Sequence, residues 1–86
     1  MRLTITVTSD DIANGKPGQA TSCPVALGAY RAGVAEALVG PREIRYGRGW
    51  VPLPRSAIRF VRAFDHGRPV APFRFRLNVP KEAGHP

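Results

Sequence analysis

The sequence predicts an α+β fold, a small mixed sheet of three to five strands with two helices packed on one face. A stretch near each end of the chain alternates apolar and polar residues, which is typical of half-buried strands. Between these stretches, two segments repeat apolar residues at helical spacing. The 86 residues suffice for one modest core. We therefore expect a single domain over residues 1–79, followed by a flexible C-terminal tail over residues 80–86.

Residues 2–8 form the first predicted strand. Apolar residues alternate with threonines, and β-branched side chains dominate the segment, a composition that favours a pleated, half-buried strand. Residues 9–15 begin with Ser-Asp-Asp and end with Asn-Gly. These ends predict one short helical turn with Ile12 facing inward, and residues 16–22 then form a loop.

Residues 23–34 predict the central helix of the fold. Pro24 suits its first turn, where a missing N–H costs nothing, and we expect Cys23 as the N-cap and Gly33 as the stop. The apolar arc of this helix is about twice as wide as a one-sided surface helix needs. Either the helix is the deep centre of the fold, or part of it binds a partner, and a homo-oligomer formed through this helix is one such partner. The two apolar sides consist of Val25, Ala29 and Ala32, and of Leu27, Tyr30 and Val34.

The middle of the chain predicts three short strands. Residues 36–39 return to the sheet, and a right-handed strand–helix–strand crossover would place them parallel to the first strand. Residues 42–46 and 50–53 predict a hairpin with a glycine-rich connection. Pro52 cannot donate to a central ladder, so the second arm is expected at an edge.

Residues 55–65 predict the second helix and residues 73–77 the last strand. The helix carries an inward stripe at i, i+3, i+4 and i+7, and the strand alternates strictly. The side chains expected to face the core are Ala57, Phe60, Val61, Phe64, Phe73, Phe75 and Leu77.

Arginine dominates the charge of the chain. Thirteen basic residues, 11 of them Arg, stand against six acidic ones, for a net charge of +7. Such an excess predicts attraction to polyanions or acidic partners, and planar guanidinium groups suit phosphates and carboxylates. The candidate binding residues lie on the second helix, the last strand and the hairpin: Arg55, Arg59, Arg62, Arg74, Arg76, Arg45 and Arg48.

Three interpretations of these arginines remain open. They could follow a phosphate backbone, they could contact an acidic patch on a protein, or they could be a solvated basic surface. Single-stranded nucleic acid would also need exposed aromatic side chains for base stacking. Only Trp50 and Tyr46 are free for that role, since the phenylalanines point inward, and no nucleic-acid-binding motif occurs.

Catalysis and metal binding find little support. Cys23 at a helix N-terminus could have a lowered pKa, but a nucleophile also needs a base and an oxyanion site, so we expect a structural thiol. One cysteine and two scattered histidines cannot form a closed zinc site. The acidic residues near position 10 lack calcium-loop spacing, and the hairpin glycines lack the phosphate-loop signature. We expect no enzyme, no metal and no cofactor.

The expected compartment is the cytoplasm. A single cysteine allows no internal disulfide. The first residues do not have the pattern of a signal peptide. No apolar run reaches the roughly 18–20 residues that a membrane span requires, so we expect no membrane partner.

Short motifs spread over most of the chain form a distinctive set: Thr6-Val7-Thr8, Asp11-Ile12, Gly15, Cys23-Pro24-Val25-Ala26-Leu27, Leu53-Pro54, Arg62-Ala63-Phe64-Asp65, Pro69-Val70 and Phe73-Arg74-Phe75. This set resembles a family of small proteins from bacteriophages of actinobacteria and from their hosts. The resemblance implies no particular activity and transfers no functional residues. It suggests a phage-encoded product in the host cytoplasm, a kind of protein that often binds a host macromolecule and sometimes slows host growth.

Taken together, these observations lead us to expect a non-enzymatic binding protein that engages a host protein through its basic surface. Sequence-unspecific nucleic-acid binding by the same arginines is the alternative.

Overall fold

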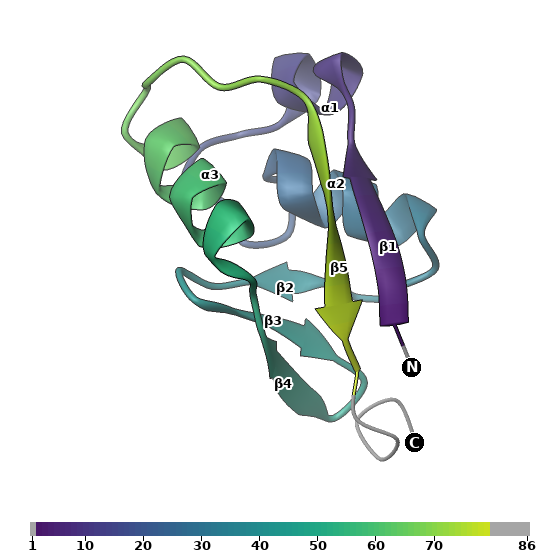
Figure 1. Ribbon diagram of the computed structural model, residues 1–86. Helices are drawn as coiled ribbons and strands as arrows, with labels where there is room; N and C mark the ends of the chain where they lie inside the picture. The colour runs from purple at the N-terminus through teal and green to yellow at the C-terminus, as the bar shows by residue number, and fades with distance from the viewer. Residues whose placement is uncertain (1, 80–86) are drawn as a thin grey trace.

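The computed structural model describes residues 2–79 and has α+β architecture, with two antiparallel sheets and the helices around a shared core (Figure 1). The predicted tail at residues 80–86 lies outside the described residues. The strands are β1 (Arg2–Val7), β2 (Leu38–Val39), β3 (Glu43–Tyr46), β4 (Gly49–Pro52) and β5 (Phe73–Asn78). The helices are α1 (Ser9–Asn14), α2 (Pro24–Arg31) and α3 (Arg55–Asp65). None of them has the length and apolar character needed to cross a membrane, as far as the described residues go.

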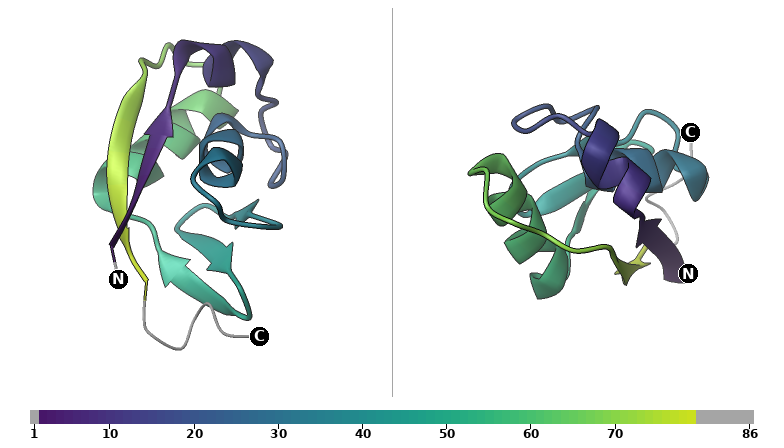
Figure 2. Two further views of the ribbon diagram at one scale, coloured as in Figure 1. Left: turned by 90° about the vertical axis from the view of Figure 1, so that its right-hand side faces the viewer. Right: turned by 90° about the horizontal axis from the view of Figure 1, so that it is seen from above.

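A long two-stranded ribbon joins the two ends of the chain. β1 pairs antiparallel with β5 in a register that runs from Arg2–Asn78 to Val7–Phe73. The inner face of the ribbon carries Ile5, Val7 and Leu77, all fully buried. As Figures 1 and 2 show, α2 lies across this inner side, and α3 runs beside β5 at the edge of the ribbon. The alternation seen in the sequence therefore predicts both strands and their buried faces correctly.

The predicted parallel strand after α2 is wrong. β2 pairs antiparallel with β3, and the sheet order is β2–β3–β4, so the fold has two antiparallel sheets and not one mixed sheet. The place beside β1 is taken by β5, which offers six residue pairs where β2 has only two residues. Left-handed backbone at Gly33 and Glu36 (φ 101° and 54°) turns the chain away from β1 after α2.

The hairpin and α3 agree with the sequence prediction. β3 and β4 pair antiparallel around a turn at Gly47, whose φ of 63° suits glycine. β4 is an edge strand of the three-stranded sheet, as Pro52 indicated. α3 covers the predicted residues and buries Ala57, Phe60 and Val61.

α2 is the centre of the fold. Val25, Ala26 and Ala29 are completely buried, and the helix lies across β1 so closely that a side chain at Gly28 would meet the Thr6 carbonyl oxygen at 2.7 Å. The deep position explains most of the wide apolar arc. Of the apolar arc, only Tyr30 is exposed, and Leu27 and Ala32 are partly buried.

Candidate binding surface

The arginines of α3 form a stripe on the side of the helix that faces away from the core. At 100° per residue, Arg55, Arg59 and Arg62 fall within about 60° of one another, opposite the buried Ala57 and Phe60. All three are exposed. We call these three residues the α3 stripe, and its position follows directly from the helical spacing of the sequence.

The arginines of β5 lie on the outer face of the ribbon. The register places Arg74 opposite Thr6 and Arg76 opposite Thr4, and all four residues are exposed. Directly opposed residues in an antiparallel pair have neighbouring side chains. The outer face of the ribbon is therefore a polar, basic surface.

Phenylalanine stacking holds α3 beside β5. The rings of Phe60 and Phe73 stack with centroids 4.6 Å apart, and Phe73 stacks in turn on Phe75 at 5.4 Å. Phe60 and Phe75 are buried, as predicted, whereas Phe64 and Phe73 are half-buried at the boundary between helix and strand. The arginines of α3 and β5 thus occupy neighbouring elements.

The arginines of the hairpin lie on another part of the molecule. Arg45 is on β3, and Arg48 is in the turn before β4. Both are exposed, and Arg45 Nε donates a hydrogen bond to the Gly47 carbonyl oxygen at 3.3 Å. The ribbon and the three-stranded sheet bury their inner faces in one core, so their outer faces point in different directions (Figure 2). The seven candidates do not form a single patch.

Arg42 connects the hairpin side to α3. It lines a hollow of about 160 Å³ together with Arg62, Ile58 and His66. It also lines the shallow hollow beside Trp50. The sequence predicted Arg42 at the start of the hairpin arm 42–46 but did not indicate that it shares a hollow with α3, because only the fold brings the two segments together.

Among the described residues, no carboxylate forms an ion pair with a candidate guanidinium group. Among residues 2–79, the one ion pair within 4.0 Å joins Arg31 to Asp11 and involves none of the seven candidates. Asp65, which follows Arg62 by three residues on α3, accepts a hydrogen bond from the Gly18 backbone N–H at 3.0 Å. The charge of the α3 stripe is therefore free to attract an anionic partner.

The sequence did not predict the ion pair between Arg31 and Asp11. Asp11 and Thr8 form a capping box at the start of α1, and Nη1 and Nη2 of Arg31 both donate to the Asp11 carboxylate. Arg31 also donates to the Thr6 carbonyl oxygen at 2.9 Å, which links α1, α2 and β1. The hydrogen bonds from Arg31 hold the pKa of Asp11 below its ordinary value. The sequence predicted capping residues at 9–11 and Thr8 in the first strand, whereas Thr8 is the N-cap, and no local pattern indicated a partner 20 residues away.

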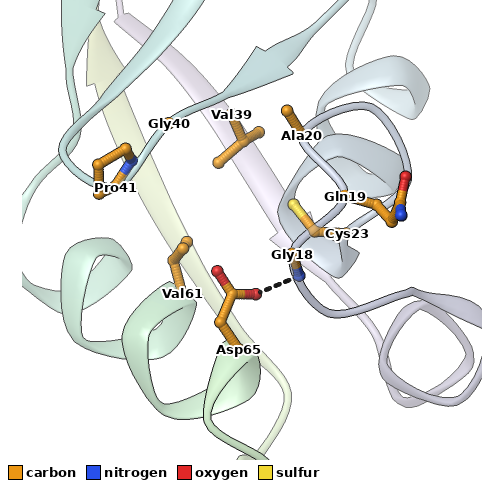
Figure 3. A pocket seen from close by; sticks show the side chains of 9 residues that line it. All are labelled: Gly18, Gln19, Ala20, Cys23, Val39, Gly40, Pro41, Val61 and Asp65. Carbon is orange, nitrogen blue, oxygen red and sulfur yellow. Dashed lines mark hydrogen bonds between the residues drawn. The ribbon is translucent and has the colours of Figure 1, made fainter.

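Cys23 is a buried thiol beside a hollow. The hollow has a volume of about 210 Å³ and is lined by Cys23, Val39, Val61 and Asp65, among others (Figure 3). Burial raises the pKa of the Cys23 thiol. This effect is larger than the opposite effect of hydrogen bonds from the backbone N–H groups of Ala26 and Val25, which lower the pKa. A raised pKa leaves little thiolate near neutral pH. Within the described part of the chain, no cluster of three metal-binding side chains exists.

Comparison of the chain with protein-family models, with curated proteins and with solved structures finds no match.

Proposed function

We propose that this chain is a non-enzymatic binding protein whose α3 stripe contacts an acidic surface on another protein. The observation that carries the proposal is the set of three exposed, adjacent guanidinium groups without a carboxylate partner among residues 2–79. Like charges one turn apart weaken an isolated helix slightly, and a carboxylate-rich partner would relieve this repulsion. Charged groups of this kind set the rate and specificity of association.

The resemblance to actinobacteriophage proteins supports a host protein as the partner. A product that acts in the host cytoplasm meets many acidic proteins, and binding one of them offers a route to an effect on host growth. A positive surface steers an acidic partner toward it at a rate that falls as salt rises. The proposal therefore includes salt-sensitive association.

Affinity capture from an actinobacterial lysate tests the proposal. The bait carrying Arg55→Glu, Arg59→Glu and Arg62→Glu is compared with the unchanged protein, and circular dichroism confirms that both are folded. We expect the unchanged protein to retain a specific acidic protein that the triple variant does not. Retention of the same proteins by both baits would exclude the α3 stripe as the binding surface.

Sequence-unspecific nucleic-acid binding is the second candidate, favoured by arginines on three different elements, α3, β5 and the hairpin. Phosphate contacts of this kind lose affinity steeply as salt rises. A mobility-shift titration with duplex DNA at low and moderate salt separates the two candidates. No shift at low salt would exclude the arginines as a duplex-binding surface and leave the protein partner.

A further inference from the structure

We infer that the outer face of the three-stranded sheet binds single-stranded nucleic acid, with Trp50 as the base-stacking side chain. This inference uses other elements than the α3 stripe and does not depend on a protein partner. We define the Trp50 face by its residues: the cross-strand row of Leu38, Arg45 and Trp50, Arg42 in the hollow beside Trp50, and Arg48 in the turn between β3 and β4. The row spans the sheet from β2 to β4.

Trp50 is the most exposed large hydrophobic residue among those described, with 48 % of its surface exposed. Tyr30 is exposed to 40 %, but its hydroxyl donates to the Ala37 carbonyl oxygen at 3.3 Å. Within residues 2–79, the Trp50 indole N–H has no hydrogen-bond partner and its ring contacts no other aromatic ring. A tryptophan so placed is suited to contact with another molecule.

The sheet register places a cation next to this ring. Leu38 pairs with Arg45 across β2 and β3, and Arg45 pairs with Trp50 across β3 and β4. The three side chains therefore form one row on the outer face, which spans about 10 Å at the ordinary spacing of strands. Their chain neighbours Val39, Ile44 and Val51 are buried. Because successive side chains of a strand point to opposite faces, the row lies on the face away from the core.

A hollow beside the indole provides room for a flat ligand. It has a volume of about 420 Å³ and is lined by Gly40, Pro41, Arg42, Glu43 and Trp50. Gly40 has no side chain, and a Cβ there would lie 4.0 Å from Trp50 Cζ3 and 3.3 Å from the Glu43 carbonyl oxygen. The absence of a side chain at Gly40 keeps the edge of the ring open.

The charge around the ring favours a polyanion. Arg42, Arg45 and Arg48 are exposed, and within residues 2–79 none has a carboxylate within 4.0 Å. Arg62 of α3 lines a hollow together with Arg42 and so lies beside the Trp50 face. Two carboxylates face these arginines, Glu43 and Asp65, and Asp65 accepts a hydrogen bond from Gly18. A positive groove combined with an aromatic platform is the arrangement that binds single strands without sequence preference.

The experiment uses the fluorescence of Trp50, which is the only tryptophan of the chain. The purified protein is titrated at low salt with a thymidine dodecanucleotide, with inorganic polyphosphate and with polyglutamate. We expect the oligonucleotide to quench Trp50 at lower concentration than either polymer, since only the oligonucleotide carries bases. Three phosphate contacts predict that log K falls with log salt at a slope of about −2.

Variants separate stacking from charge. Affinity for a fluorescein-labelled oligonucleotide is measured by anisotropy for Trp50→Leu, which keeps an apolar side chain without an aromatic ring. One lost stacking contact predicts a loss of about 5- to 150-fold. Arg45→Gln should reduce the salt slope by about 0.7. Arg68→Gln is the matched control, because Arg68 is an exposed arginine outside all the candidate surfaces, and we expect it to change the affinity less than twofold.

Three results would overturn the inference. The first is an affinity of the Trp50→Leu variant equal to that of the unchanged protein, provided that circular dichroism shows both to be folded. The second is binding of polyphosphate as tight as that of the oligonucleotide, which would mean that the face recognises charge alone. Tighter binding and stronger quenching by polyglutamate would overturn it as well and assign the Trp50 face to an acidic protein.

Discussion

Adding one methyl group at Gly28 probes the contact on which the central helix depends. The Cβ of an alanine would lie 2.7 Å from the Thr6 carbonyl oxygen and 3.2 Å from Ile5 Cγ2. An ordinary van der Waals contact begins near 3.4 Å, so helix and strand would have to separate by about 0.7 Å, the difference between 3.4 and 2.7 Å. The obstructing atom belongs to the backbone, so no side-chain rotation relieves the contact.

The magnitude follows from two opposing terms. Overpacking of a tight interior costs about 1–3 kcal/mol. Alanine is the better helix former and recovers about 1 kcal/mol relative to glycine. The Thr6 carbonyl oxygen also accepts the hydrogen bond from Arg31 at 2.9 Å, so its displacement weakens the link between α2 and β1. We expect Gly28→Ala to lower the free energy of unfolding by about 1 kcal/mol, taking the middle of the overpacking range.

Thermal unfolding followed by circular dichroism measures this effect. A loss of 1 kcal/mol shifts the midpoint of a domain of this size by about 4–8 °C. Ala63→Gly on α3 is the control for helix propensity, with an expected loss of about 1 kcal/mol. A Gly28→Ala variant as stable as the unchanged protein would refute the close packing of α2 on β1.

Three further predictions address the ion pair, the thiol and the aromatic stack. The pKa of Asp11 is lowered in the folded state, so ionised Asp11 contributes its full stabilisation above its unfolded pKa near 3.9 and loses it as the pH falls through its folded pKa. Asp11→Ala should therefore lower the free energy of unfolding by about 2 kcal/mol at pH 7 and by less at pH 3. Equal losses at pH 7 and pH 3 in denaturant titrations would contradict a stabilising ion pair between Asp11 and Arg31. Cys23 should react slowly with a thiol reagent at pH 8 in the folded protein and rapidly after unfolding, because the thiol is buried with a raised pKa; fast labelling of the native state would contradict its position. Phe60→Ala should cost about 3–5 kcal/mol, since Phe60 stacks on Phe73 in the core, and a small shift in the denaturation midpoint would contradict the junction of α3 and β5.

Local patterns predicted the elements well because each is determined by its own residues. The alternation in β1 and β5 and the stripe of α3 place side chains such as Ile5, Phe60 and Phe75 in the core without reference to other segments. Pro24 at the first turn and Gly33 after the last turn define the ends of α2 for the same reason.

The pairing of the strands could not be predicted locally. β2 has two residues, too few for its own pattern to select a neighbour, and β5 enters from the far end of the chain to pair with β1. The same limit applies to the candidate surfaces. The Arg31–Asp11 pair and the hollow shared by Arg42 and Arg62 join segments that are distant in sequence, so composition revealed the excess of arginine but not its division among separate faces.

The most direct test of the central proposal is a graded charge series on the α3 stripe. Arg55, Arg59 and Arg62 are replaced together by Lys, by Gln or by Glu, and the amount of captured acidic partner is measured for each variant at low salt. The proposal predicts recovery in the order Arg, Lys, Gln, Glu, with none for Glu. Equal recovery by all four proteins would contradict it.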